Sequence, residues 1–340
     1  MIRTIKIENY RCFKSLKIED VARLTVIVGD NGSGKTALLE AMFLPLGTSS
    51  GLIARYRAQR GLDGAFNATR RRIEDALFGE LFYKFQYNNP VRVELTGDGP
   101  ETRAVTIARG EWQETPSSVA IQYVDSKGQE RVLVPDFDAQ GRPSFPETGE
   151  DIPNFFHFSA NTATGSIETA GRFSDMSRAR AQSEFVKTFT NEYAWLQDIS
   201  IEVIAGAPSL YGTLVDTKDK IALANISGGI ARMVAVMVAI ASRKNAVVLV
   251  DEIENGIHYK HQVAIWKGLL RFLREHDGQM ICTTHSQEWL EALVEAGGEK
   301  LDDVALWRVE RGKDQPTVRQ FSGATLRAGL EHGKEVRSNE

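Results

Sequence analysis

The sequence predicts an α/β fold in which a mostly parallel sheet is flanked by helices and carries an added antiparallel β subdomain. Three observations support this fold class. Near the N-terminus, a glycine-rich loop joins an apolar strand to a helix. Several short alternating segments follow between residues 80 and 150, and after residue 226 apolar strands alternate with amphipathic helices. Alternating strands and helices are typical of parallel sheets covered by helices, whereas consecutive short strands form antiparallel meanders.

The composition indicates a globular protein with a sizeable core. The 340 residues are 42% hydrophobic and 25% charged, which suits one large domain. The formal net charge of -4 argues against coating of nucleic acid through overall charge. Cys12 and Cys282 lack metal-ligand spacing, so free thiols are expected. The longest apolar run falls far short of the roughly 20 residues of a membrane span, and the N-terminus lacks a signal-peptide pattern, so we expect a cytoplasmic protein without membrane contact.

The N-terminal elements follow the order strand, strand and helix. Residues 3–10 (RTIKIENY) alternate with a period of two, and residues 23–29 (RLTVIVG) form a continuous apolar run typical of a buried strand. The glycine-rich loop GDNGSGKT comes next, and the following helix, residues 37–47 (ALLEAMFLPLG), ends at Pro45 and Gly47.

Residues 50–150 are expected to form an inserted helical and β-meander subdomain within a single head that spans residues 1–340. Its strand-like segments, such as VRVELTG and VAIQYVD, are separated by turn sequences such as GDGPE and DSKGQ. The beginning of the insert is basic, with only Asp63 as counter-charge to six arginines: Arg55, Arg57, Arg60, Arg70, Arg71 and Arg72. This basic stretch is either a solvated helix face or a surface for phosphates or an acidic partner.

The second half of the chain contains the alternating strands and helices. Residues 174–226 are expected to form a helical subdomain that leads to a second glycine-rich helix start. Expected strands lie at 245–252 (NAVVLVDE), 279–286 (QMICTTHS), 304–311 (VALWRVER) and 316–321 (PTVRQF), with helices at 261–276 (HQVAIWKGLLRFLREH) and 287–296 (QEWLEALVEA).

The loop GDNGSGKT matches the phosphate-binding pattern G-x-x-x-x-G-K-[ST] in its required context between a strand and a helix. Its glycines let backbone N–H groups close around phosphates, and the helix N-terminus adds partial positive charge. Lys35 would reach the β and γ oxygens of a nucleoside triphosphate, and Thr36 would place its hydroxyl on Mg²⁺. The expected nucleotide-binding residues are Gly29, Asn31, Gly32, Ser33, Gly34, Lys35, Thr36 and Ala37.

Two further strand ends carry polar side chains that suit hydrolysis. The strand VVLVDE ends with adjacent carboxylates, which are costly at the end of an apolar strand unless they have a function. Asp251 would hold Mg²⁺ through its water shell, and Glu252 would orient the attacking water or accept its proton. His285 follows the strand QMICTT, at the sheet edge where ligands of α/β folds bind, and could reach the γ-phosphate.

The stretch ANISGGIAR is a second glycine-rich helix start. Ser227, Gly228 and Gly229 offer a hydroxyl, backbone amides and a helix dipole, which is the chemistry of a γ-phosphate clamp. One molecule needs no second clamp, because its first loop already cradles the phosphates. These residues are therefore expected to contact the nucleotide of another molecule.

The order of these motifs resembles the ABC-class ATPases, which include SMC, Rad50, RecF and OLD-type proteins. More narrowly, IKIENYRCFKSLKIE, FFHFSAN, ISGGIARM, VLVDEIENGIHY and LRAGLEHGKEVR are similar to the prokaryotic OLD-like AAA15/AAA21 ATPases. The resemblance covers most of the chain and is loose over residues 50–150. It implies a P-loop NTPase of ABC-ATPase type that uses ATP and Mg²⁺.

The resemblance also implies roles at matching positions. Two heads would pack head to tail as a homodimer or higher homo-oligomer, with Ser227, Gly228 and Gly229 contacting ATP in trans. Lys35, Glu252 and His285 would be catalytic, as the P-loop lysine, the catalytic glutamate and the switch histidine. Thr36 and Asp251 would be the metal residues, Asn255 would lie across the dimer seam, and Arg11 would approach the phosphates.

Two departures from the family pattern limit the resemblance: a Q-loop glutamine is not identifiable, and no coiled-coil arm fits between the first loop and ISGG. About 55 residues follow His285, too few for the TOPRIM nuclease domain of OLD nucleases. The resemblance then implies a slow ATPase of anti-phage defence that senses a trigger and controls a separately encoded effector, such as a TOPRIM-type or other nuclease. The alternatives are a RecF-like ATPase that clamps DNA and a module in which ATP serves only as structural glue.

Overall fold

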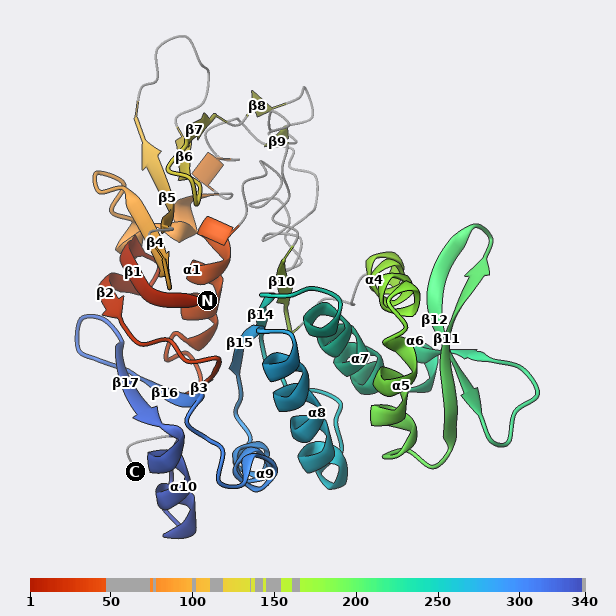
Figure 1. The fold of residues 1–340 in the computed structure, drawn as a ribbon. Helices are drawn as coiled ribbons and strands as arrows, with labels where there is room; N and C mark the ends of the chain where they lie inside the picture. Colours follow the sequence, from red (N-terminus) through yellow and green to blue (C-terminus); the bar gives the residue numbers. More distant parts are fainter. Residues whose placement is uncertain are drawn as a thin grey trace.

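A six-stranded, mostly parallel sheet forms the centre of the computed structural model, with strand order β10-β14-β15-β3-β16-β17 (Figure 1). The first five strands are parallel, and β17 closes the sheet antiparallel to β16. Their bounds are β3 Leu24–Val28, β10 Phe155–Phe158, β14 Val247–Val250, β15 Gln279–Thr283, β16 Val304–Glu310 and β17 Thr317–Ser322. The helices that accompany these strands confirm the predicted α/β class.

The structure describes residues 1–46, 74–75, 78–99, 102–110, 119–134, 136–137, 143–144, 154–160 and 166–337. The arginines between Arg55 and Arg72 lie outside the described residues, and both interpretations of that basic stretch remain open. Within the described parts of the chain, no helix combines the length and the apolar character that crossing a membrane requires.

Helices cover both faces of the central sheet because its strands are apolar on both sides. On β3, Leu24, Val26 and Val28 belong to the core on the side of α7, α8 and α9, whereas Ile27 belongs to the core on the side of α1. The bounds are α1 Lys35–Leu46, α4 Ser166–Arg178, α5 Gln182–Thr190, α6 Leu223–Ile226, α7 Gly228–Ala241, α8 Gln262–Glu275, α9 Gln287–Gly297 and α10 Gly323–Glu331. This arrangement places the ends of the parallel strands beside the starts of α1 and α7.

A second, antiparallel sheet has the strand order β2-β1-β4-β5-β6-β7. Its strands are β1 Ile2–Tyr10, β2 Phe13–Ile18, β4 Val91–Gly97, β5 Thr102–Arg109, β6 Val119–Val124 and β7 Glu130–Leu133. The meander within the region 50–150 therefore continues the N-terminal hairpin, because β1 pairs with β4. Alternate residues of β4 (Val91, Val93 and Leu95) are buried in the same core as α1. Short elements complete this region: 3-10 helices at Gly79–Leu81 and Tyr83–Phe85, and β8 Asp136–Phe137 paired with β9 Pro143–Ser144.

The segment 174–226 is helical only in part. After α4 and α5 it forms an antiparallel hairpin of β11 Leu196–Ile204 and β12 Ala207–Leu214, to which the short strand β13 Ile221–Ala222 is added. The alternation in DISIEV and the turn at Ala205 and Gly206 favour this hairpin. It extends away from the central sheet on the far side of α4 and α5 (Figure 1).

Candidate nucleotide-binding site

The loop between β3 and α1 is held tightly against the central sheet. A side chain at Gly29 would place its Cβ 2.3 Å from the carbonyl oxygen of Val309, the second-last residue of β16. Gly29 also has a φ of 144°, a value that favours glycine. The loop therefore needs glycine here for both space and conformation, as its phosphate-binding pattern requires.

Lys35 begins α1 and is buried within the loop that precedes it. Its Nζ donates hydrogen bonds to the carbonyl oxygens of Gly29, at 2.7 Å, and Asp30, at 2.9 Å. Burial lowers the pKa of Lys35, and the nearby carboxylates of Asp251 and Asp30 oppose this shift. The ammonium group lies where phosphate oxygens could replace the two carbonyl oxygens.

A buried hydrogen-bond network positions Asp251 at the end of β14. Its Oδ1 accepts a hydrogen bond from Thr283 Oγ1 at 2.6 Å, and both carboxylate oxygens lie 3.4 Å from Thr36 Oγ1. The same Thr283 oxygen accepts a hydrogen bond from the backbone N–H of Glu252 at 2.8 Å. The Thr36 hydroxyl and the Asp251 carboxylate are hard oxygen donors that fit Mg²⁺, which in nucleotide sites draws further ligands from phosphate and water.

Glu252 and His285 lie at the same edge of the sheet, shortly after the ends of β14 and β15, and both line one cavity. Glu252 has a φ of 48°, an unfavourable value for a residue with a side chain, and such conformations cluster at functional sites. Its Oε2 accepts a hydrogen bond from Asn255 Nδ2 at 2.8 Å, which fixes the carboxylate. The backbone of His285 is held by Glu254, whose Oε1 accepts from His285 N at 2.8 Å, and by Arg337, whose Nη1 donates to His285 O at 2.8 Å.

A cavity of about 810 Å³ brings most of the predicted residues together. Its lining comprises Asn31, Gly32, Gly34, Lys35, Thr36, Ala37, Glu252, His285 and Arg11, together with Cys12, Glu80, Phe82, Lys84 and Phe85. Arg11 forms an ion pair with Glu40 of α1 at the side of this cavity. The predicted Gly29, Ser33 and Asp251 are not among the lining residues: Gly29 packs against Val309, Ser33 is buried, and Asp251 accepts the hydrogen bond from Thr283.

The wall formed by residues 80–85 was not predicted to belong to the site. Phe85 lines the cavity, and its side chain is 62% exposed. An exposed aromatic ring beside a phosphate-binding loop is a surface on which a nucleobase can stack. This role is hard to predict from the sequence, because Phe85 falls in a short aromatic run, FYKFQY, that looks like an ordinary strand.

The second glycine-rich helix start forms a regular N-cap but does not line this cavity. Ser227 Oγ accepts a hydrogen bond from the backbone N–H of Ile230 at 3.3 Å. A Cβ at Gly228 would meet open space, whereas one at Gly229 would lie 2.0 Å from the carbonyl oxygen of Gly256. Ser227, Gly228 and Gly229 are absent from the described lining of the chain's own cavity. At this start of α7, Gly228 is exposed, Ser227 is half-buried and Gly229 is buried.

Arg232, one turn into α7, is a further site residue that the motifs did not reveal. It is 7% exposed, and its guanidinium donates hydrogen bonds to the carbonyl oxygens of Ser159, at 2.6 Å, and Asp251. A buried arginine that binds strand-end carbonyls links α7 to the ends of β10 and β14. The sequence signal was weak, because a single arginine in an apolar helix is usually interpreted as a surface residue.

Comparisons with known proteins agree with this geometry. A family model described as "AAA domain, putative AbiEii toxin, Type IV TA system" matches residues 24–291. A Helicobacter pylori protein named ATP/GTP phosphatase is 23% identical over 339 residues, which cover 88% of this chain and 89% of that protein. The SMC head solved with the C-winged helix domain of ScpA matches with a TM-score of 0.54 and 14% identity, covering 94% of this chain and 98% of that chain. The fold is therefore that of an ABC-type, SMC-head-like P-loop ATPase.

Similarity to DNA repair proteins is local. The DNA replication and repair protein RecF of Idiomarina loihiensis is 42% identical over 43 residues, which cover 13% of this chain and 12% of that protein. A match of this length extends over a motif and not over the whole head.

Proposed function

We propose that this chain, which belongs to the AAA-domain family matched over residues 24–291, binds ATP with Mg²⁺ and hydrolyses it slowly. The observation that carries the proposal is the convergence of Lys35, Thr36, Glu252 and His285 on one cavity, with Asp251 hydrogen-bonded behind them. Those side chains supply a cation for phosphate, oxygen donors for the metal, and a base for water.

Each residue has a role that its contacts support. Lys35 exchanges its two carbonyl partners for phosphate oxygens, and Thr36 and Asp251 hold the metal, which neutralises charge on the phosphates when bound. Glu252, oriented by Asn255, accepts the proton of the attacking water. His285, whose backbone is held by Glu254 and Arg337, contacts the γ-phosphate. Arg11 remains a candidate for phosphate contact beside Glu40.

We further propose that the working unit is a head-to-tail homodimer or a larger homo-oligomer. Ser227, Gly228 and Gly229 would bind the γ-phosphate in the neighbour's site. They do not line the cavity of their own molecule, and they form the start of a 14-residue helix whose N-terminus attracts anions. Assembly would then depend on ATP.

The biological role follows from the resemblance to OLD-like ATPases. The chain would act in anti-phage defence, where ATP-dependent assembly senses a trigger and controls a separately encoded effector such as a TOPRIM-type nuclease. The local similarity to RecF favours one alternative, an ATPase that clamps DNA. A DNA titration with ATP at two salt concentrations separates the two, because a clamp loses affinity steeply as salt rises.

The variant Glu252→Gln tests the catalytic and assembly proposals together. Turnover should fall about 100-fold or more, because a positioned base contributes about 10²–10⁴. Mass photometry should show larger particles with ATP than without it. Ser227→Arg should keep ATP binding but lose both pairing and turnover, and Lys35→Ala should lose ATP binding. If Glu252→Gln keeps one particle size with and without ATP, the proposed assembly is wrong.

A further inference from the structure

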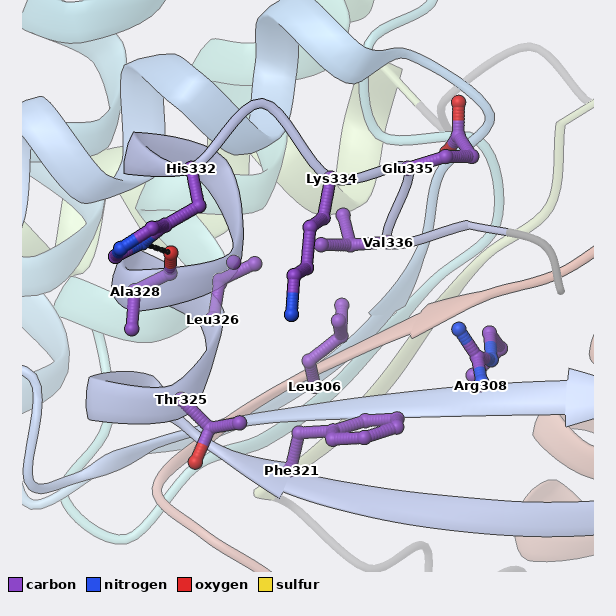
Figure 2. Close-up of a pocket in the computed structure, with 11 residues that line it drawn as sticks. Leu306, Arg308, Phe321, Thr325, Leu326, Ala328, His332, Lys334, Glu335 and Val336 are labelled. Atoms are coloured by element: carbon purple, nitrogen blue, oxygen red, sulfur yellow. Dashed lines mark hydrogen bonds between the residues drawn. The ribbon is translucent and has the colours of Figure 1, made fainter. Parts of the chain in front are cut away.

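A second cavity, of about 400 Å³, lies between α10, the β16–β17 hairpin and the segment that follows α10 (Figure 2). Its volume is within the range of about 300–1,000 Å³ typical of small-molecule sites. It is separate from the nucleotide cavity, and no residue lines both among the described lining residues.

The cavity has an apolar interior. Leu306 of β16 and Leu326 of α10 are each 1% exposed, and Val336 and Phe321 add further apolar surface from the other two sides. Figure 2 shows these side chains facing a common space. An apolar cavity of this size favours a ligand with a hydrocarbon or aromatic body.

Among the described residues, the charged groups around this interior are paired except for Lys334. Arg308 is paired with Glu310 at 2.8 Å, and Glu335 is paired with Arg337 at 2.7 Å. Lys334 forms no ion pair within the described residues, and Figure 2 shows its side chain extending toward Leu306. An ammonium group above an apolar surface suits a ligand with one anionic group.

The wall of the cavity is connected to the nucleotide site through two residues. Glu335 lines the cavity and accepts hydrogen bonds from Arg337 Nε, at 2.9 Å, and Nη2, at 2.7 Å. The remaining guanidinium nitrogen, Nη1, donates to the backbone carbonyl oxygen of His285 at 2.8 Å. A ligand that moves Glu335 therefore changes the support of the loop that carries His285.

We infer that this cavity binds a small monoanion with an apolar body, such as a medium-chain carboxylate, and that binding changes nucleotide affinity through Glu335, Arg337 and His285. The binding step stands on the cavity alone. The coupling step rests on the proposed function, because it requires ATP in the first cavity. By linkage, ATP must change the affinity of the anion by the same factor.

Octanoate tests the binding step on the full chain, with 1-octanol as the probe that has the same body without the charge. Isothermal titration calorimetry should show octanoate binding at least fivefold more tightly than octanol. Lys334→Met should weaken octanoate about fivefold, in line with an exposed ion pair, and should leave octanol unchanged. The control Lys267→Met, an exposed lysine on α8, should change neither.

Filling the cavity provides a second test. Ala328→Trp, which places an indole in the cavity, should abolish octanoate binding, whereas Ala324→Trp on the same helix but outside the lining should not. Equal affinity for octanoate and octanol, or unchanged octanoate binding in Ala328→Trp with an unaltered melting temperature, would overturn the inference.

The coupling step is tested by measuring ATP affinity with and without saturating octanoate. We expect a change of threefold or more, which disappears in the double variant Glu335→Gln, Arg337→Gln. This variant keeps the net charge while breaking the link to His285 O. If Lys35→Ala abolishes ATP binding but octanoate leaves the ATP affinity of the wild-type chain unchanged, the coupling alone is refuted. ATP binding that survives Lys35→Ala would instead refute the proposed function.

Discussion

Thr283 should be a larger determinant of stability than its size suggests. Its hydroxyl is buried between β14 and β15, donates to Asp251 Oδ1 at 2.6 Å, and accepts from the backbone N–H of Glu252 at 2.8 Å. Thr283→Val keeps the volume but removes both hydrogen bonds. The change leaves a buried carboxylate oxygen of Asp251 and the half-buried N–H of Glu252 without this partner.

The magnitude follows from the two lost partners. A buried polar group left unsatisfied costs about 1–3 kcal/mol, and bonds to charged groups lie at the upper end. Because the Asp251 carboxylate would keep, among the described residues, only the 3.4 Å contacts to Thr36 Oγ1, the total destabilisation should be about 2–4 kcal/mol. ATP turnover should also require more Mg²⁺, because the carboxylate loses its orientation.

Thr25 on the adjacent strand β3 is the matched control. Thr25 and Thr283 are both 1% exposed or less, but Thr25 Oγ1 has no hydrogen-bond partner in the part of the chain that the structure describes. Thr25→Val should therefore leave the free energy of unfolding unchanged or raise it by about 1 kcal/mol. Urea unfolding of the two variants, followed by tryptophan fluorescence, measures the contrast. Equal unfolding midpoints for Thr25→Val and Thr283→Val would refute the reasoning.

Three further predictions concern the start of α7, the wall of the nucleotide cavity and strand β10. Gly229→Ala should prevent stable folding or displace α7, because its Cβ would lie 2.0 Å from Gly256 O, whereas Gly228→Ala should keep the wild-type melting temperature. Phe85→Ala should weaken ATP binding about tenfold, the effect of losing one base-stacking ring, and inorganic triphosphate binding should stay unchanged; calorimetry with both ligands checks this. Burial lowers the pKa of His157 to about 4. As the pH drops from about 6.5 toward 4, the histidine is protonated in the unfolded state but not in the folded state, so the free energy of unfolding should decrease over this range. Melting temperatures across that window should show a smaller decrease for His157→Phe.

The site was largely predictable where it depends on a local pattern. Gly29, Lys35 and Thr36 lie within eight consecutive residues, so their spacing alone determines their relation to one strand and one helix. Asp251 and His285 were predictable because each follows an apolar strand, and parallel strands bring their ends to one edge of the sheet.

The parts that were missed depend on contacts between distant segments. The pairing of β1 with β4 joins residues about 90 positions apart, and nothing local in the meander indicates that it extends the N-terminal hairpin. Phe85 lines the nucleotide cavity because the segment before β4 is held to the end of β1, by a bridge between Tyr10 and Phe82 and by a hydrogen bond from Arg11 N to Leu81 O. The buried position of Arg232 likewise depends on the ends of β10 and β14, which are remote in sequence.

Asp251 connects the two glycine-rich helix starts, which are nearly two hundred residues apart. Its side chain faces Thr36 at the start of α1, and its backbone carbonyl accepts a hydrogen bond from Arg232 in α7. The close contact between Gly229 and Gly256 fixes α7 at a second point, in the loop that follows Asp251. A shift of this strand end therefore moves both helix N-termini together. In the proposed head-to-tail assembly, ATP bound in one molecule's cavity would in this way move Ser227, Gly228 and Gly229, with which the same molecule contacts the nucleotide of its neighbour.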